Sequence, residues 1–427
     1  MPHFTTDKAF ALAKDAQDAL KSFREAFFIP QHKGKDCIYF CGNSLGLQPK
    51  TTPQYLEQEL EDWQKLGVEG HFEGKNPWFS YHHFVEKPLA NLVGAKTEEV
   101  VAMNTLTVNL HLMMLSFYRP TAQRFKIMVE GAAFPSDHYA VQSQAKLHGF
   151  SPEEAIVYLE PRTGEHCLRT EDILARIEAE KDQLTLVMLG GVNYYTGQFF
   201  DLKTITEAAH KAGAMAGFDL AHAVGNMPLS LHDWQVDFAV WCSYKYLNSG
   251  PGSVAGAFVH EKHTHNTEIV RLEGWWSNRE DSRFKMRRTI EAQQNAAAWQ
   301  MSNAPVLSLA AHRAALDIFE RAGGMEKLRQ KSLELTAYLA FLLEKINEKA
   351  QQQVLEVITP TNASERGCQL SIIVKKNAKP IFERITAKGV VADWREPDVI
   401  RVAPVPLYNK FEEVFIFAEI LADEIFD

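Results

Sequence analysis

A lysine and an aspartate each follow an apolar segment that has the length of a buried strand. Asp219 closes the run 214–218, and Lys245 follows the run 238–242 in a polar, glycine-rich loop. A lysine directly beyond a buried strand is costly unless it is paired, neutralised or used covalently. A lysine amine can bind an aldehyde covalently, and an aspartate can keep a pyridine nitrogen protonated so that the ring accepts electrons. Together the two residues predict a site for pyridoxal phosphate (PLP).

Each residue taken alone has an ordinary explanation, a solvated loop lysine for Lys245 and a helix N-cap for Asp219. The pair lies on successive strand ends, separated by enough chain for one helix and a neighbouring strand, and Ser243 and Tyr244 lie beside the lysine. This arrangement favours the PLP site over the two separate explanations.

The segments that must position these residues alternate between strand and helix patterns. Short apolar runs occur at 100–103, 125–129, 155–159, 184–189, 214–218, 238–242 and 254–259, and helical patterns such as 171–181 and 202–213 lie between several of them. The alternation predicts βαβ units around a mostly parallel sheet that is covered on both faces. Ligands of such sheets bind at the carboxyl ends of the strands.

A smaller α+β domain is expected to follow this large domain. The chain opens with a helical pattern to about residue 31 and a short strand at 37–41. After Pro305, helices are expected at 306–321, 325–350, 379–388 and 411–425, and strands at 354–358, 369–374 and 399–402. We therefore predict an N-terminal helical segment (1–65) packing on the small domain, a large PLP-binding domain (66–305) and a small C-terminal α+β domain (306–427).

Two further strand ends carry candidate cofactor contacts. Thr107 is expected to be the N-cap of a helix at 108–118, whose free N–H groups would hold a phosphate. Phe134 would lie flat on the cofactor ring, and Asp137 would support a polar neighbour. An ordinary threonine cap, a core aromatic and a turn aspartate remain open as alternatives.

Composition excludes several classes of protein. The 427 residues carry a formal net charge of −9, which argues against nucleic-acid binding. Five scattered cysteines predict no disulfide framework. No metal is expected at Cys37 and Cys41. His260, His263 and His265 are predicted to lie in a surface loop and not to bind a metal. The glycines at 250–256 do not open a βαβ unit, so no dinucleotide site is expected. Without a signal peptide or a membrane span, a cytoplasmic location is expected.

These segments together resemble kynureninase, a PLP-dependent family of the aspartate-aminotransferase fold (fold type I). The motifs that carry the resemblance run from residue 40 to residue 408 and are Phe40-Cys-Gly-Asn-Ser-Leu-Gly-Leu-Gln-Pro-Lys50, Leu106-Thr-Val-Asn109, Phe134-Pro-Ser-Asp-His138, Tyr195-Thr-Gly-Gln198, Phe218-Asp-Leu-Ala-His-Ala-Val-Gly-Asn226, Cys242-Ser-Tyr-Lys-Tyr-Leu-Asn248, Gly274-Trp275, Arg283-Phe-Lys-Met286, Ser302-Asn303 and Arg401-Val-Ala-Pro-Val-Pro-Leu-Tyr408. Asp-Leu-Ala-His-Ala together with Ser-Tyr-Lys-Tyr-Leu-Asn is far more specific than a single lysine.

The resemblance implies a homodimer that hydrolyses the Cβ–Cγ bond of L-kynurenine, 3-hydroxy-L-kynurenine or both, giving anthranilate or 3-hydroxyanthranilate and L-alanine in tryptophan breakdown or NAD synthesis. Lys245 would hold PLP and move protons, Asp219 would pair with the pyridine nitrogen, and Tyr244 would reach the phosphate. The other implied roles are phosphate contacts from Leu106 and Thr107, ring contacts from Phe134, Asp137 and His222, contributions from the partner subunit at Trp275 and Asn303, a carboxylate clamp at Arg401, and substrate contacts from His71, Ser44 and Asn303.

One departure and two alternatives accompany the resemblance. Gly190 stands where some members of the family have a serine that touches the cofactor. Arg401 offers a planar fork that matches a carboxylate, although a structural salt bridge is the default explanation on sequence alone. The rival functions are another fold-type-I enzyme, such as a cysteine desulfurase or an aminotransferase, and a PLP-binding protein without activity. None of the cysteines lies in a loop typical of a desulfurase nucleophile.

Overall fold

A mixed sheet lies at the centre of the larger part of the molecule. The structure, a computed structural model, describes residues 4–266 and 268–426. Within these residues the sheet has seven strands in the order β4-β10-β9-β8-β7-β5-β6. Their bounds are β4 Val100–Ala102, β5 Lys126–Glu130, β6 Ile156–Leu159, β7 Leu184–Gly190, β8 Met215–Asp219, β9 Phe238–Trp241 and β10 Gly256–Val259. β10 runs antiparallel to its two neighbours, and the pairs among β9, β8, β7, β5 and β6 are parallel.

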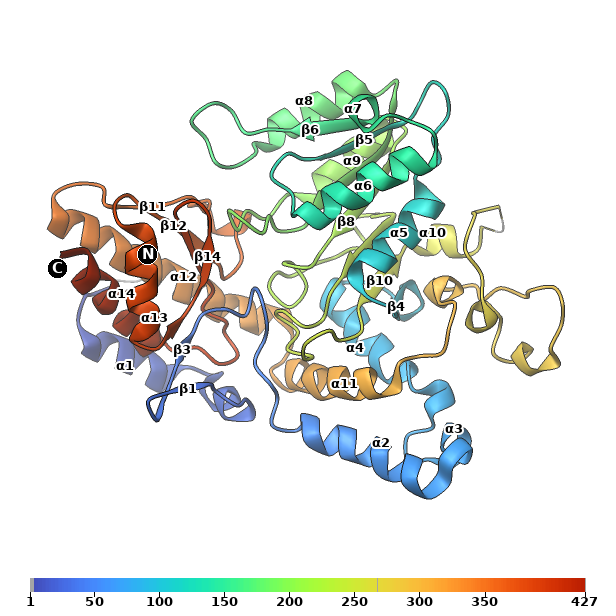
Figure 1. The fold of residues 1–427 in the computed structure, drawn as a ribbon, viewed down its shortest axis with the longest axis horizontal. Helices are drawn as coiled ribbons and strands as arrows, with labels where there is room; N and C mark the ends of the chain where they lie inside the picture. Colours follow the sequence, from blue (N-terminus) through green and yellow to red (C-terminus); the bar gives the residue numbers. More distant parts are fainter. Residues whose placement is uncertain (1–3, 267, 427) are drawn as a thin grey trace.

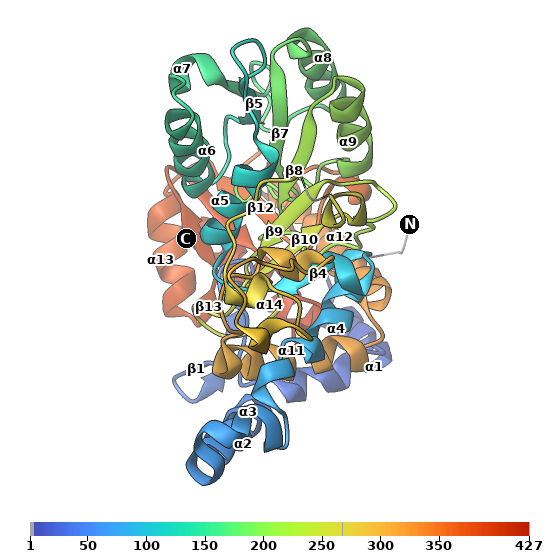
Figure 2. The ribbon, with the colours of Figure 1, turned by 90° about the vertical axis from the view of Figure 1, so that its right-hand side faces the viewer.

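Helices cover both faces of this sheet, as Figure 2 shows. On one side lie α5 (Leu106–Phe117) and α6 (Pro135–Leu147), and on the other lie α8 (Thr170–Glu180) and α9 (Leu202–Lys211). Side chains alternate between the faces of a strand. In β7, Leu186 and Met188 therefore join the core under α5 and α6, whereas Val187 and Leu189 join the core under α8 and α9. The predicted doubly covered sheet is confirmed.

A smaller antiparallel sheet lies to the left in Figure 1. It contains β11 (Leu355–Val357), β12 (Leu370–Val374), β15 (Val399–Val402) and β14 (Asp393–Arg395) in that order. The helices α1 (Lys8–Gln17), α12 (Met325–Ala350), α13 (Ala378–Ala387) and α14 (Phe411–Phe426) share its apolar core. β3 (Ile38–Tyr39) pairs in parallel with β13 (Val390–Val391), so the early chain is joined to this part of the molecule.

The helix α11 (Val306–Arg321) packs on α2 (Thr52–Leu66) and α4 (His83–Val93) below the large sheet (Figure 1). The remaining short elements are β1 Gln31–His32, β2 Lys35–Asp36, α3 Gly70–Glu73, α7 Pro152–Ala155, α10 Glu261–Thr264, and the 3-10 turns Lys21–Ala26, Gly67–Glu69, Trp78–Ser80, Thr97–Glu99, Trp275–Ser277, Arg283–Lys285, Ala296–Trp299 and Ala363–Glu365. Among the described residues, no helix is both long and apolar enough to cross a membrane.

Two local predictions are wrong. The opening helix ends at Gln17, because Asp18 is extended and its carboxylate accepts the N–H of Leu20 at 2.8 Å in place of a helical bond. His260 and His263 do not lie in a surface loop. His260 is buried and caps α10, and Nε2 of His263 lies 2.8 Å from a carboxylate oxygen of the buried Asp237. Buried carboxylates draw these imidazoles inward, and sequence spacing does not reveal such partners.

Candidate active site

The carboxyl ends of β8 and β9 bring Asp219 and Lys245 into one pocket. The two strands are parallel neighbours, with Asp219 opposite Val240, and Lys245 follows four residues after the end of β9. The pocket is lined by Leu106, Thr107, Glu130, Ala133, Phe134, Ser136, Asp137, Gly190, Val192, Asn193, Tyr194, Asp219, Ala221, His222, Tyr244 and Lys245. Eight of the predicted cofactor and catalytic residues are therefore gathered at the sheet edge that the alternating pattern indicated.

The amine of Lys245 lies against a neutral imidazole. Its Nζ is 3.0 Å from Nε2 of His222. Burial lowers the pKa of His222 well below its usual value, and the charges of Lys245 and Arg401 act in the same direction. A neutral ring can accept a hydrogen bond from Nζ at its Nε2 atom, and this contact holds Nζ in position. Nδ1 of His222 has no hydrogen-bond partner among the described residues.

Three buried carboxyl groups line the same pocket. Burial raises the pKa of Asp219, Asp137 and Glu130, and the charge of Asp219 further raises the pKa of the other two. Oδ1 of Asp219 accepts the N–H of Ala221 at 2.7 Å, whereas Oδ1 of Asp137 has no partner within the described part of the chain. Lys245 is the one cationic side chain among the described lining residues. The weak compensation at Asp219 and Asp137 favours a ligand that brings a positive N–H.

Two helix N-termini also line the pocket. α5 begins at Leu106 and α6 at Pro135, and neither N-cap side chain accepts a bond from its helix. Oγ1 of Thr107 lies 3.1 Å from Oγ of Ser136, so the two helix starts are adjacent. The free N–H groups at the two helix starts and the hydroxyls of Thr107 and Ser136 can bind a phosphate. The predicted N-cap is displaced, because Thr105 and not Thr107 holds that position and the helix starts two residues earlier.

Two aromatic rings flank the lysine. Nζ of Lys245 is 6.0 Å from the ring centroids of both Phe134 and Tyr244. Phe134 is 47% exposed, so its face is available to a planar ligand. Burial raises the pKa of Tyr244, so its phenol stays protonated and can donate a proton or a hydrogen bond.

The early motif 40–50 holds the lysine loop from outside. The N–H of Gly46 donates to the carbonyl of Tyr244 at 2.8 Å, and the N–H of Leu47 donates to Oδ1 of Asn248 at 3.1 Å. A Cβ on Gly46 would lie 2.3 Å from the carbonyl oxygen of Lys245. Glycine is therefore required for this close approach.

Arg401 lies on β15 behind the pocket wall formed by Tyr194. It is buried, Nη1 donates to the carbonyl of Tyr194 at 2.6 Å and Nη2 donates to Oδ2 of Asp393 at 2.5 Å. Oγ of Ser44 donates to the same Asp393 oxygen at 2.5 Å, so two of the predicted substrate residues share one carboxylate. The Nε of Arg401 has no partner among the described residues, which leaves a donor for a substrate carboxylate.

His71, Trp275 and Asn303 do not line the pocket of this chain. Asn303 is exposed. His71 contacts Trp78 edge to face, and the indole N–H of Trp275 donates to the carbonyl of Arg283. The structure of one chain therefore leaves these three predicted residues outside the site.

Glu130 and Asn193 are pocket residues that the sequence analysis missed. Oε1 of Glu130 accepts the N–H of Gly190 and Oε2 accepts Nδ2 of Asn193, both at 2.6 Å. A Cβ on Gly190 would lie 2.8 Å from Oε1 of Glu130, so Glu130 occupies the space that a serine at 190 would need. Glu130 follows the apolar run 125–129 directly, the same signal that identified Asp219.

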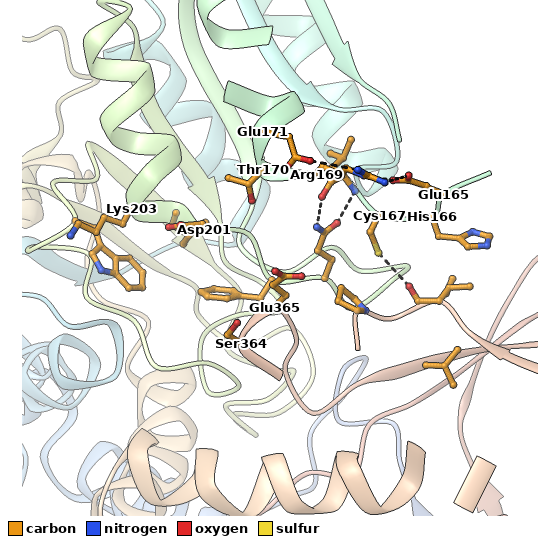
Figure 3. A pocket seen from close by; sticks show the side chains of 18 residues that line it. Glu165, His166, Cys167, Arg169, Thr170, Glu171, Asp201, Lys203, Ser364 and Glu365 are labelled. Carbon is orange, nitrogen blue, oxygen red and sulfur yellow. Dashed lines mark hydrogen bonds and ion pairs between the residues drawn. The ribbon is translucent and has the colours of Figure 1, made fainter. Parts of the chain in front are cut away.

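A larger cleft of about 880 Å³ lies elsewhere, between the starts of α8 and α9 and the segment 357–365. Figure 3 shows its walls, where Arg169 pairs with Glu165 and the thiol of Cys167 donates to the carbonyl of Ile358 at 3.3 Å. Its charged side chains lie apart from Lys245 and Asp219, and none of the predicted site residues lines it.

The pocket fits PLP at every group that the cofactor presents. The helix starts would receive the phosphate, Phe134 would face the ring, Asp219 would offer a carboxylate to the ring nitrogen, and Lys245 would supply an amine for the aldehyde. The fold and this site define a PLP-dependent enzyme of fold type I.

Comparisons with known proteins identify the family. Residues 328–421 match the kynureninase C-terminal domain. The chain is 53% identical to a kynureninase of Flavobacterium psychrophilum over 99% of both chains, 53% identical to one of Myxococcus xanthus over 98% of this chain and 97% of the relative, and 49% identical to one of Nematostella vectensis over 97% and 93%. The chain belongs to the kynureninase family, whose members are PLP-dependent hydrolases that cleave C–C bonds.

Solved structures share the fold at low sequence identity. A cystine C–S lyase, C-DES, in complex with its product cysteine persulfide matches with a TM-score of 0.76 at 17% identity over 91% of this chain and 97% of that chain. A cysteine desulfurase of Thermococcus onnurineus matches with a TM-score of 0.73 at 17% identity over 91% and 94%. At this identity the similarity concerns the fold alone, and it confirms the predicted fold type.

Proposed function

We propose that this chain hydrolyses the Cβ–Cγ bond of L-kynurenine, of its 3-hydroxy form or of both, releasing anthranilate or 3-hydroxyanthranilate and L-alanine. The observation that carries the proposal is the contact of Lys245 with the neutral His222 at the edge of a pocket that also holds Asp219. The family membership supports the choice of reaction within fold type I.

Lys245 would hold the cofactor, and its amine would then take the proton from the substrate Cα and deliver it elsewhere. PLP supplies, when bound, an electron sink for negative charge that develops on the substrate carbons. Asp219 would keep its carboxylate against the ring nitrogen, and His222 and Asp137 would support this end of the ring. Leu106, Thr107 and Tyr244 would hold the phosphate, Phe134 would cover the ring, and the protonated phenol of Tyr244 would serve the substrate carbonyl as an acid.

Arg401 would bind the substrate carboxylate through its unpartnered Nε and a remaining Nη hydrogen, with Ser44 beside it. Asp393 and the carbonyl of Tyr194 fix the plane of the guanidinium, so less rotamer freedom is lost when the substrate binds. The positive charge of Arg401 would also offset the cost of burying the substrate carboxylate.

We further propose a homodimer with shared active sites. Phe72, Trp275, Phe284 and Met286 are each at least two-fifths exposed, and an apolar surface of this kind marks an interaction site. His71, Trp275 and Asn303 lie outside the pocket of their own chain, so they would complete the pocket of the partner subunit. The division into segments 1–65, 66–305 and 306–427, a cytoplasmic location and a role in tryptophan breakdown or NAD synthesis complete the proposal.

Steady-state kinetics with purified, PLP-loaded protein test the proposed reaction. We expect L-kynurenine or its 3-hydroxy form to give equal amounts of the aromatic amine and of alanine. Release of the aromatic amine is measured by fluorescence or absorbance. Consumption of a keto acid would indicate an aminotransferase, sulfide release from cysteine a desulfurase, and bound PLP without turnover a protein that has lost activity. Any of these results in place of kynurenine cleavage would refute the proposed function.

Replacing Arg401 with lysine is expected to raise the KM for kynurenine at least about tenfold, because a bidentate hydrogen bond between charged groups is lost. The kcat is expected to change less. The matched control is Arg162→Lys, an exposed arginine that pairs with Asp172. An unchanged KM in the Arg401 variant would exclude the clamp role.

A further inference from the structure

Two imidazoles and a carboxylate converge at the start of α4. His82 is the N-cap residue of this helix and His83 is its first residue, while Glu280 comes from the segment that follows Trp275–Ser277. Nε2 of His83 lies 3.1 Å and Nε2 of His82 lies 3.3 Å from Oε1 of Glu280. The three side chains lie outside the PLP pocket, and none has a role in the proposed reaction.

His82 is the unusual member of this group. Its side chain is 1% exposed, and within the described part of the chain neither ring nitrogen forms a hydrogen bond of acceptable geometry. A buried polar nitrogen without a partner costs free energy. A ligand at Nε2 would remove part of this cost.

Two of the three spacings between the ligand atoms match a tetrahedral metal site. Bonds of about 2.0–2.1 Å from zinc to nitrogen or oxygen place neighbouring ligand atoms roughly 3.3 Å apart. The two distances to Oε1 of Glu280 agree with this spacing, and all three ligand atoms lie within 4.8 Å of one another. His83 and Glu280 are partly exposed, which provides a path for an ion and room for a water as fourth ligand.

Glu86 supplies the outer contact that such sites use. Its Oε2 lies 2.9 Å from Nδ1 of His83. A carboxylate that accepts Nδ1–H directs Nε2 of the same ring toward a metal and fixes the tautomer. The alternative is that Glu280 pairs with both imidazoles without any metal, and this alternative leaves the ring nitrogens of His82 without a hydrogen bond of acceptable geometry among the described residues.

We propose that His82, His83 and Glu280 bind a divalent transition metal of the zinc class. Two imidazoles and one carboxylate are ligands that zinc accepts readily. The bound ion would join the start of α4 to the segment that carries Trp275 and Arg283. The expectation of no metal concerned the cysteines and His260, His263 and His265. Glu280 is far from His82 along the chain, so spacing in the sequence does not reveal this site.

A second group of the same composition provides a control. Glu99, His232 and His260 also lie within reach of one ion, but their polar atoms already have protein partners. Glu99 accepts the N–H groups of Lys96 and Glu261 as well as the His232 imidazole, and Nδ1 of His260 accepts the N–H of Lys262. This group needs no ligand.

The test is calorimetric titration of ZnCl₂ into tag-free, PLP-loaded protein that has been treated with a chelator and returned to metal-free buffer. We expect one zinc per chain, loss of this binding in His83→Gln and Glu280→Gln, and retention in His232→Gln. Glu86→Gln is expected to weaken the affinity about 10–100-fold. Cobalt in place of zinc is expected to give the visible absorption bands of tetrahedral coordination.

Thermal unfolding of the unmutated protein gives an independent readout, because an ion that binds the folded state alone raises the Tm. Zinc should raise the Tm of the wild-type protein and of His232→Gln, and it should not raise the Tm of Glu280→Gln. Absence of zinc binding in the wild-type protein, or binding that persists unchanged in both His83→Gln and Glu280→Gln, would overturn the proposal.

Discussion

Replacing Lys245 with alanine is expected to abolish the visible absorbance of the PLP-loaded protein and to lower kcat for kynurenine by at least about 10³-fold, since the loss of a nucleophile and of a proton-transfer group combine. Lys245 is the one cationic side chain among the described residues of the pocket, so no neighbouring lysine can replace it. The absorption spectrum and steady-state anthranilate release measure the two effects.

Lys203→Ala is the matched control, because Lys203 is an exposed lysine that lines the separate cleft shown in Figure 3. It should keep the absorbance and the rate of the wild-type protein. A Lys245→Ala protein that stays yellow and turns over kynurenine normally would remove Lys245 from the centre of the mechanism.

Replacing Asp219 with asparagine is expected to lower kcat by about 10²-fold or more, which is the usual loss when one preorganised electrostatic contact of an active site is removed. Asparagine keeps the shape of the side chain and an oxygen that can accept the N–H of Ala221, but it cannot hold a protonated ring nitrogen by charge. The measurements are kcat, the cofactor absorption spectrum and the Tm of the apoprotein.

The same substitution should not destabilise the apoprotein. Burial raises the pKa of Asp219, and its charge raises the pKa of Asp137, so a neutral side chain at 219 removes a repulsion. We expect an equal or higher Tm, with the exposed Asp182→Asn as control. Wild-type rates in the Asp219 variant would refute the electrostatic role, and a collapse of the Tm would assign a structural role instead.

The sheet and its carboxyl edge could be predicted because the signal is local. Buried parallel strands require continuous apolar runs, and β5, β7, β8 and β9 begin or end within one or two residues of the predicted runs. A polar residue placed directly after such a run must lie at the sheet edge, and this reasoning located Asp219. Applied to the run 125–129, it would also have located Glu130.

The contacts that cross between distant segments could not be predicted. Asp393 joins Ser44 to Arg401, and Gly46 packs on the loop of Lys245, but no spacing along the chain links these residues. The start of α5 was displaced because Thr105 and Thr107 are equally suitable caps by residue type. The sequence predicts a surface loop for His260 and His263 because the buried carboxylates beside them, Glu99 and Asp237, lie in other segments.

The covalent attachment at Lys245 is the claim on which the proposed chemistry depends, and reduction with borohydride tests it most directly. The PLP-loaded protein is reduced, digested and examined by mass spectrometry for the lysine that carries the phosphopyridoxyl group. We expect the group on the peptide containing Lys245, with a stoichiometry close to one per chain. Attachment at another lysine, or a reduced protein without any modified lysine, would contradict it.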